Sequence, residues 1–343
     1  MSENRNILVT GGCGYIGSHT VIELIHHGYT PVIADDFRNA NRKVLEGFNE
    51  LLSFVPEIHE MDICDRKAMK ALFASKKFHG IIHFAADKAV GESVENPLKY
   101  YHNNLEGLNV VCAMALEFGV FNFVFSSSCT VYGEPNGVKE VNESSPKSQP
   151  GSPYGNTKLI GEQMLADVHN AFPKFKVMNL RYFNPVGAHP SGALGEFPIG
   201  KPNNLFPFIT QTAIGKQECL VVFGNDYPTT DGTCVRDYIH VCDLAESHVK
   251  ALKFLENQSG NCLEYINIGT GRGSTILEVI QLFESRSGLK LNWKFGPRRP
   301  GDVVEIYANA DRSRDVIGWQ PKYSLSEAID HAWQWEQRIA EIR

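Results

Sequence analysis

Residues 7–17 read Ile7-Leu8-Val9-Thr10-Gly11-Gly12-Cys13-Gly14-Tyr15-Ile16-Gly17. The apolar run that ends at Thr10 predicts a buried strand, and the apolar residues from Tyr15 onward predict a helix. The glycines between them allow a turn whose backbone N–H groups face an anion, where larger side chains would hold a phosphate away. We therefore expect this segment to hold the pyrophosphate of a dinucleotide, through Gly11, Gly14, Tyr15, Ile16 and Gly17.

Short β-branched runs alternate with helix-length segments through the rest of the first half of the chain. The expected strands are residues 7–10, 30–35, 80–84, 121–126 and 176–180. This alternation predicts an α/β fold, a doubly wound parallel sheet of the Rossmann type with helices on both faces. In such a sheet ligands bind at the carboxyl ends of the strands, and the motifs described below fall at that edge.

Acidic residues follow the second expected strand. Asp35 and Asp36 come about 20 residues after the glycine loop, where a carboxylate accepts hydrogen bonds from the adenosine ribose. A carboxylate there repels a 2′-phosphate, so the sequence favours NAD over NADP. Asp62 ends another strand-like stretch and has two interpretations: a contact with the adenine amino group, or the N-cap of a helix over residues 66–73.

Tyr154 and Lys158 are spaced four residues apart in a segment that predicts a helix, with Pro153 suited to its first turn. A free tyrosine has a pKa of about 10, so it is a poor base unless a cation stabilises the phenolate. We expect Lys158, with oxidised nicotinamide, to supply that charge. Ser128, expected on the loop after the fourth strand, completes a proton relay to a substrate hydroxyl. These residue types predict acid–base chemistry on an alcohol or sugar.

Two other chemistries are less favoured by the sequence. Cys129 lies beside the serine run, but no histidine is near it in sequence, and we expect a packed thiol. His79 and His83 have a spacing that suits a metal on a helix, yet the residues between them predict a strand, so we expect packed or surface histidines and no metal site.

The 343 residues carry a formal net charge of -6, which gives no broad basic face for nucleic acid. No apolar run approaches the roughly 20 residues of a membrane span, and the N-terminus lacks a charged-then-apolar signal. The eight cysteines show no paired short spacing and are expected to be reduced. These features predict a cytoplasmic protein with neither a membrane nor a nucleic-acid partner.

After Arg181 the sequence changes in character. Five prolines between residues 185 and 207, with several glycines, predict extended loops over a cleft. We expect a dinucleotide-binding domain over residues 1–181 and a smaller α/β domain over 182–343 that mainly holds the substrate. Segments around 236–255 are expected to pack back on the first domain. Beyond Arg181, helices are expected at residues 243–254, 276–288 and 326–342, and a strand at 265–269.

Blocks along the whole chain resemble the extended short-chain dehydrogenase/reductase family, and within it the UDP-glucose 4-epimerases, also called UDP-galactose 4-epimerases. The blocks are residues 9–19, 83–93, 125–133, 154–158, 181–187, 223–227, 231–233 and 236–241. The resemblance implies reversible C4 epimerisation of UDP-galactose and UDP-glucose through a transient 4-keto sugar, with tightly bound NAD, as part of galactose metabolism. It also implies a homodimer, formed through helices near residues 98–117 and 154–171.

The motifs and the resemblance together assign the site residues. Ser128, Tyr154 and Lys158 are expected to be catalytic. The residues assigned to the cofactor are Gly11, Gly14, Tyr15, Ile16, Gly17, Asp35, Asp36, Phe37, Asp62, Ile63, Phe84, Lys88, Asn103, Ser126, Tyr154, Lys158 and Tyr182. Those assigned to the UDP-hexose are Lys88, Ser128, Tyr154, Asn184, Asn204, Leu205, Phe223, Arg236, Tyr238, Arg299 and Asp302. Ile306 falls where the resemblance places a bulky aromatic or a small residue linked to N-acetylated sugars, so acceptance of those sugars stays open.

Three alternatives share part of this sequence pattern. A nucleotide-sugar 4,6-dehydratase begins with the same oxidation, but it needs an Asp-Glu pair where this chain has Cys129-Thr130. A uronic-acid epimerase needs an arginine for the substrate carboxylate, and none is evident. A non-catalytic NAD-sensing regulator has no need of Tyr154 and Lys158, so their presence favours an enzyme.

Overall fold

The computed structural model describes residues 5–135, 137–299 and 302–341. Its largest element is a seven-stranded sheet with the order β11-β7-β5-β4-β1-β2-β3, in which every neighbouring pair is parallel. Its strands are β1 (Asn6–Thr10), β2 (Thr30–Asp35), β3 (Glu57–Glu60), β4 (Gly80–His83), β5 (Asn122–Ser128), β7 (Lys176–Tyr182) and β11 (Leu263–Ile268). The doubly wound Rossmann-type sheet expected from the sequence is therefore confirmed.

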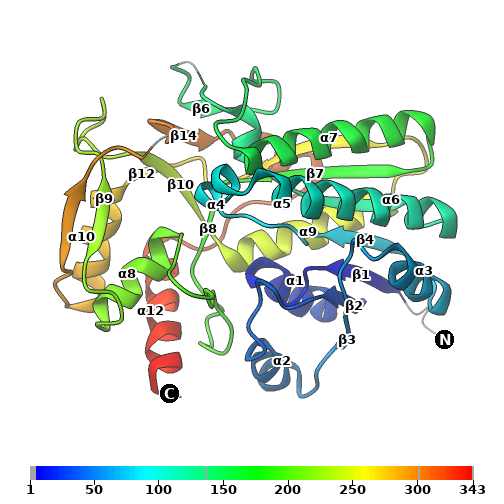
Figure 1. The fold of residues 1–343 in the computed structure, drawn as a ribbon, viewed down its shortest axis with the longest axis horizontal. Helices are drawn as coiled ribbons and strands as arrows, with labels where there is room; N and C mark the ends of the chain where they lie inside the picture. The colour runs from blue at the N-terminus through cyan, green and yellow to red at the C-terminus, as the bar shows by residue number, and fades with distance from the viewer. Residues whose placement is uncertain (1–4, 136, 300–301, 342–343) are drawn as a thin grey trace.

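Helices cover both faces of this sheet (Figure 1). One face carries α1 (Tyr15–His26), α2 (Val44–Leu52), α9 (Val241–Glu256) and α11 (Asp311–Ile317). The other carries α3 (Arg66–Ser75), α6 (Gly107–Phe118) and α7 (Pro153–Ala171). Successive β1 residues serve the two layers in turn, since Ile7 and Val9 join one buried cluster and Leu8 joins the other.

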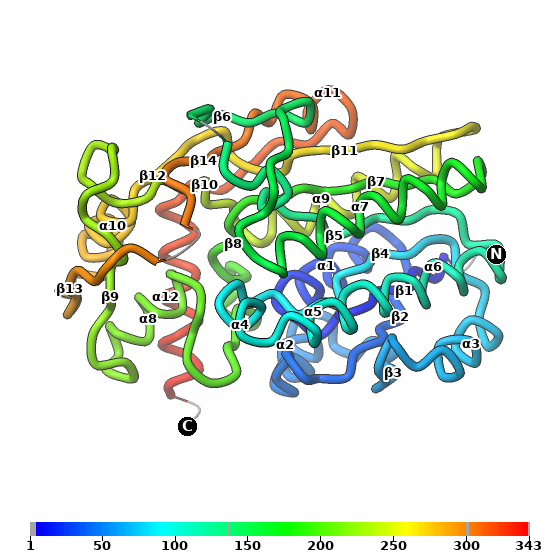
Figure 2. Tube along the Cα trace, turned by 45° about the horizontal axis from the view of Figure 1, so that its top comes forward, coloured from blue at the N-terminus to red at the C-terminus, as the bar shows by residue number. Residues whose placement is uncertain are grey.

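A second, smaller body of structure lies beside the carboxyl ends of the strands (Figures 1 and 2). Its sheet joins β6 (Glu140–Val141), β8 (Asn184–Val186), β10 (Val235–His240), β12 (Gly273–Thr275) and β14 (Glu305–Ala308), and β9 (Leu220–Phe223) pairs with β13 (Trp293–Gly296). Its helices are α8 (Leu205–Ala213), α10 (Ile276–Ser287) and α12 (Leu325–Glu341). Apolar side chains of these three helices, β9 and β10 form one core cluster.

Two elements from the second half of the sequence belong to the large sheet or its cover. β11 pairs in parallel with β7 along six residues at the sheet edge, and Figure 2 shows the two running side by side. α9 packs against α1, β5 and β7. The chain thus crosses from the large sheet to the smaller body and returns.

The helix expected near residues 98–117 is instead divided. It consists of α5 (Pro97–Tyr101), a π-helical turn over His102–Glu106, and α6. The turn buries Asn103 and Asn104, and Asn104 donates to Thr157 Oγ1 on α7 at 3.0 Å. A π-helical turn inside a helix often marks a functional site. Two short elements complete the chain: α4 (Val90–Glu95) and a 3-10 turn over Cys129–Tyr132.

Candidate active site

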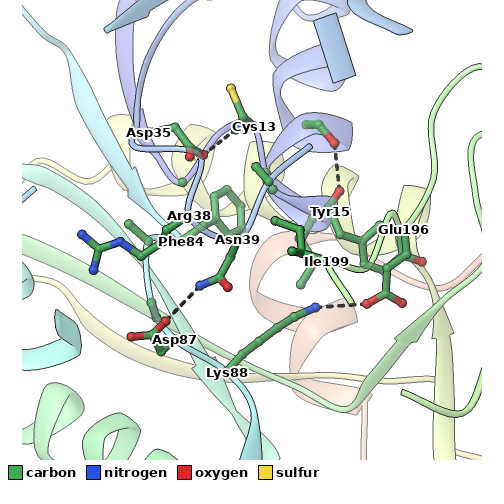
Figure 3. Close-up of a pocket in the computed structure, with 18 of the residues that line it drawn as sticks. Cys13, Tyr15, Asp35, Arg38, Asn39, Phe84, Asp87, Lys88, Glu196 and Ile199 are labelled. Atoms are coloured by element: carbon green, nitrogen blue, oxygen red, sulfur yellow. Dashed lines mark hydrogen bonds and ion pairs between the residues drawn. The ribbon is translucent and has the colours of Figure 1, made fainter. Parts of the chain in front are cut away.

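A cavity of about 460 Å³ opens at the carboxyl ends of the large sheet, between the two bodies of structure (Figure 3). Many residues that the sequence assigned to a ligand line it. They are Gly11, Gly14, Tyr15, Ile16, Gly17, Asp35, Asp36, Ile63, Phe84, Lys88, Asn103, Ser126, Tyr154, Lys158, Tyr182 and Asn204. The cavity therefore unites assigned residues from Gly11 to Asn204, which lie far apart in the sequence.

The glycine loop forms one wall of the cavity. Gly11 has φ +71°, and a Cβ there would lie 2.7 Å from the backbone nitrogen of Ala85. A Cβ on Gly17 would collide with the carbonyl oxygen of Gly11. The backbone is thus packed as closely as glycine allows, and α1 begins there with Gly14 as its extended N-cap. This cradle fits the pyrophosphate of a dinucleotide.

Asp35 lies at the end of β2 with both carboxylate oxygens engaged. Its Oδ2 accepts from the Cys13 backbone N–H at 2.9 Å, and its Oδ1 accepts from the Phe37 N–H at 2.9 Å. Burial raises the pKa of Asp35, while these two hydrogen bonds oppose the rise. The carboxylate therefore holds the glycine loop against β2. Phe37, assigned to the cofactor from the sequence, lies outside the cavity lining, with Arg42 stacked 4.5 Å from its ring centroid.

Arg38 is a cavity residue that the sequence reasoning missed. Its Nε lies 2.5 Å from Asp36 Oδ2, its Nη2 donates to Asp62 Oδ2 at 2.6 Å, and its Nη1 donates to Asn103 Oδ1 at 2.9 Å. The guanidinium thus joins the loop after β2, the loop after β3 and the π-helical turn. Arginine in a loop of polar residues gives no local signal of these partners, because they come from distant segments.

The helix-cap interpretation of Asp62 is wrong. The N-cap of α3 is Asp65, whose side chain accepts from the backbone N–H groups of Lys67 and Ala68. Asp62 instead accepts from Cys64 N at 2.8 Å and pairs with Arg38. Asp62 lies outside the cavity lining, so its assignment to adenine gains no support from this geometry.

Tyr154 and Lys158 stand on the first two turns of α7 and face the end of β5. Ser152 caps the helix by accepting from Gly155 N at 3.2 Å, and Pro153 occupies the first turn as expected. Lys158 Nζ donates to the Ser126 carbonyl at 2.6 Å and lies 5.9 Å from the Tyr154 ring centroid. Ser128 is the last residue of β5, not a loop residue, and its hydroxyl lies close enough to the Tyr154 hydroxyl to lower the pKa of the phenol.

The electrostatics of this pair differ from the sequence expectation. Burial raises the pKa of Tyr154 to about 12, against the lowering effect of the Ser128 hydrogen bond. Burial also lowers the pKa of Lys158 to about 7. The expected lowering of the tyrosine pKa by lysine is therefore not produced by these residues alone, because both groups are removed from water. A positive charge from a ligand in the cavity would favour the phenolate.

A polar bridge spans the cavity between its two sides (Figure 3). Glu196 Oε1 accepts from Lys88 Nζ at 3.1 Å and from Asn204 Nδ2 at 2.7 Å. Lys88 follows β4, whereas Glu196 and Asn204 lie between β8 and α8. Glu196 was missed from the sequence, where a single glutamate in a loop of glycines and prolines carries no distinguishing pattern.

The other residues assigned to the UDP-hexose lie outside the lining of the cavity. Four of them form a second group in the smaller body. Arg236 Nη2 lies 3.6 Å from Asp302 Oδ1, Arg299 Nη2 lies 2.9 Å from the same oxygen, and the Arg299 guanidinium lies 5.5 Å from the Phe223 ring centroid. The structure thus brings two arginines together around one carboxylate.

Of the other four, Tyr238, Asn184 and Leu205 belong to the strands and core of the smaller body, and Ser128 ends β5. Tyr238 on β10 is buried against Phe206, with ring centroids 5.7 Å apart, and it pairs in register with Asn184 on β8. Leu205 is the first residue of α8 and packs against the core of the smaller body. Ser128, assigned to catalysis and to the substrate, adjoins Tyr154, which lines the cavity.

Comparison with known proteins identifies the family. The model of the NAD dependent epimerase/dehydratase family matches residues 7–269. The chain is 48% identical over 330 residues to a UDP-glucose 4-epimerase of Bacillus subtilis, covering 96% of each chain. The chain belongs to the UDP-glucose 4-epimerases of this family.

Solved structures of UDP-glucose 4-epimerases have the same fold. That from Stenotrophomonas maltophila, with bound NAD and formylated UDP-arabinopyranose, superposes with a TM-score of 0.95 at 41% identity, over 99% of this chain and 100% of that one. That from Bifidobacterium longum, in complex with NAD+ and UDP, gives a TM-score of 0.93 at 40% identity, over 97% and 98%.

In this UDP-glucose 4-epimerase, Ile306 occupies a packed strand and not the cavity wall. It pairs with Arg236 across β14 and β10, is 4% exposed, and packs in a cluster with Val131, Tyr132 and Phe183. Ile306 is thus the strand-pair neighbour of Arg236, a residue assigned to the substrate. Its volume therefore bears on the space beside Arg236.

His83 and Cys129, which were considered above for other chemistries, are both packed side chains. His83 lies on β4, is buried, and shares a 2.9 Å hydrogen bond with Thr10 Oγ1. Cys129 is a free thiol whose pKa burial raises to about 12, in agreement with a packed thiol. Across residues 5–135, 137–299 and 302–341 we find no group of three or more His, Cys, Asp or Glu side chains able to hold a metal. Within the same ranges no helix is both long and apolar enough to span a bilayer.

Proposed function

We propose that this epimerase interconverts UDP-galactose and UDP-glucose, with Tyr154 removing the proton from O4 of the hexose and returning it. The observation that carries this proposal is the convergence of Tyr154, Lys158 and Ser126 on the wall of the cavity that the glycine loop also lines. The sugar passes through a 4-keto form that turns over before C4 is reduced on its opposite face.

NAD fits the cavity as the resident cofactor. The cradle of the glycine loop would hold the pyrophosphate, and Asp35 and Asp36, which also line the cavity, would accept hydrogen bonds from the adenosine ribose. When bound, NAD supplies an acceptor and donor of hydride, so no outside oxidant is needed. The carboxylates of Asp35 and Asp36 would repel a 2′-phosphate on the ribose, which favours NAD over NADP.

The chain's own residues handle the proton. The Ser128 hydroxyl lies beside the Tyr154 hydroxyl and would pass the proton between sugar and phenol. Lys158 is held to the Ser126 carbonyl, which fixes its ammonium beside the Tyr154 ring. Because burial raises the pKa of Tyr154 to about 12, the positive charge of oxidised nicotinamide would favour the phenolate.

The UDP half of the substrate is proposed to bind the Arg236–Arg299 group. Two guanidinium groups suit a diphosphate, and Asp302 pairs with both of them. Asn184, Asn204, Leu205, Phe223 and Tyr238 complete this proposed surface, which belongs mainly to residues 182–343. Residues 1–181, joined by α9 and β11, are proposed to form the cofactor domain.

We also propose a homodimer in the cytoplasm. Val94 and Leu98 are 61% and 80% exposed beside α7, and an exposed apolar patch of this kind suits burial against a second copy. All eight cysteines are free, as is usual in a reducing compartment. No nucleic-acid or membrane partner is proposed.

Replacing Tyr154 by Phe tests the base assignment. The variant should retain NAD after purification, since the glycine loop is untouched, and epimerise about 100- to 10,000-fold more slowly. Retained nicotinamide is measured by absorbance, and turnover by interconversion of UDP-galactose and UDP-glucose without added oxidant or reductant. Unchanged turnover in this variant would exclude Tyr154 as the base.

A further inference from the structure

Glu162 lies one helical turn beyond Lys158, on the same face of α7 as Tyr154. The Ser127 hydroxyl on β5 donates to Glu162 Oε1 at 2.7 Å. Its neighbour Ser126 accepts from Lys158 at 2.6 Å. Two successive turns of α7, at Lys158 and Glu162, are thus each bonded to the last residues of β5, and the second contact is made by a residue outside the proposed chemistry.

The Glu162 carboxylate is also paired with a buried guanidinium. Arg181 Nε donates to Oε1 and Arg181 Nη2 donates to Oε2, both at 2.7 Å. The two side chains are 1% and 2% exposed. The partly exposed Lys147 also donates from Nζ to Glu162 Oε2, at 2.9 Å. Such a bidentate pair fixes both distance and orientation between the elements that carry it.

Arg181 carries the network from α7 to the rest of the sheet. It stands on β7 immediately before Tyr182, a cavity residue whose hydroxyl donates to Ser126 Oγ. Its Nη1 donates to the Tyr132 hydroxyl at 3.1 Å, and its guanidinium lies 4.8 Å from the Tyr265 ring centroid on β11. One buried ion pair therefore joins α7, β5 and β7 next to Ser126 and Tyr182, which line the cavity.

The pair keeps its charges despite its burial. Burial alone would raise the pKa of Glu162, but the hydrogen bonds and charge of Arg181, with help from Lys147 and Ser127, hold it below its ordinary value. A buried ion pair of this kind adds little net stability compared with apolar residues, so its geometric effect is the more informative property.

We propose that Glu162 and Arg181 are positioning residues for catalysis: they fix the register of α7 against β5 and β7, and so hold Tyr154 and Lys158 in reach of the substrate. This inference rests on the proposed roles of Tyr154 and Lys158. A misplacement of about 1 Å in a reacting group costs roughly 100-fold in rate, so a small slip of α7 has a large effect.

The test is Glu162→Gln, purified with its NAD and assayed across pH. Loosening the pair should lower kcat about 10- to 100-fold, with KM for UDP-galactose and NAD retention within about twofold of the parent. The acid limb of the kcat–pH profile should move to higher pH, because Lys158 no longer sits where it favours the phenolate. An unchanged kcat or an unmoved acid limb would overturn the proposal, as would a defect confined to KM or NAD retention.

Glu336→Gln is the matched control. Glu336 is a carboxylate of similar burial, 2% exposed, which pairs with Lys216 between α12 and the end of α8. Both variants should lower the melting temperature, but only Glu162→Gln should change kcat and its pH profile. Equal kinetic effects in the two variants would assign Glu162 a general structural role and overturn the proposal.

Ser127→Ala keeps the test decisive if Glu162→Gln does not fold. It removes one neutral donor from Glu162 and leaves the ion pair intact, and it should lower kcat several-fold without changing KM. A folded Ser127→Ala enzyme with the parent's kcat and pH profile would count against positioning by this network. Tyr154→Phe, assayed alongside, separates the two failures: if that variant is fully active, the proposed base is wrong, whatever Glu162 does.

Discussion

At the scale of single residues, the site depends on close backbone packing that larger side chains would disrupt. The glycines of the loop after β1 are required by contacts with neighbouring backbone, as at Gly17, whose absent Cβ would meet the Gly11 carbonyl. The Tyr154 hydroxyl is sensitive to its electrostatic surroundings, since burial raises its pKa to about 12. Single substitutions therefore test cofactor binding and proton transfer separately.

Replacing Gly17 by Ala should weaken NAD binding about tenfold or more, because the added methyl group forces the loop backbone apart. The measurement is the dissociation constant of NAD, followed by fluorescence or by the cofactor retained through gel filtration. Gly260→Ala is the control, since a Cβ there meets nothing within 4 Å. Full NAD retention by the Gly17 variant would contradict the assignment of this loop.

At the scale of elements, α7 is the part that converts packing into chemistry. It begins at Pro153 with Ser152 as its cap and presents Tyr154 and Lys158 to the cavity. Further along the helix, Glu162 accepts a hydrogen bond from Ser127 on β5. The π-helical turn before α6 is held to the same helix by Asn104. The reactive groups therefore stand on a helix that is fixed at its start and along its length.

Replacing Ser152 by Ala should lower the free energy of unfolding by about 1 kcal/mol, the usual effect of losing an N-cap. Because Tyr154 lies in the first turn, kcat should also fall. Thr275→Ala is the matched control: it removes the cap of α10, where Thr275 accepts from Glu278 N, and should reduce stability without changing kcat. Urea unfolding and steady-state assays make the comparison. A Ser152 variant with the parent's kcat would show that the first turn holds without its cap.

At the scale of the whole molecule, buried histidines predict the pH range of stability. Burial lowers the pKa of His19 and His248 to about 4, and of His83 and His240 to about 3. In the unfolded chain these groups bind protons below about pH 6.5 and in the folded protein they do not, so stability falls as pH decreases through 6.5. Burial raises the pKa of Asp243 to about 6, so this one group binds a proton more readily in the folded protein and opposes the loss of stability at lower pH.

Between about pH 7.5 and about pH 5.5, each of the four histidines should remove roughly 1 kcal/mol from the free energy of unfolding. Urea unfolding of the NAD-loaded protein at the two pH values measures the sum. A variant at the exposed His102, such as His102→Gln, should leave the slope unchanged. Equal stability at both pH values would contradict the burial of these rings.

The sequence predicted the parts of the site that depend on neighbours along the chain. The glycine loop, the acid after β2, and the Tyr154–Lys158 spacing are local patterns, and the structure places all of them at one cavity. Arg38, Glu196 and the Glu162–Arg181 pair escaped prediction because their partners lie far away in sequence. The broken helix at residues 102–106 escaped for the same reason, since Asn104 turns inward to bond Asp87 and Thr157.

The position of β11 has a consequence for biosynthesis. Residues 263–268 complete the edge of the large sheet by pairing with β7. Until they leave the ribosome, the nascent first half exposes the unpaired backbone of β7, a strand of buried residues such as Met178 and Leu180. A polypeptide released before residue 268 therefore carries an open sheet edge, a template for aggregation that chaperones must shield.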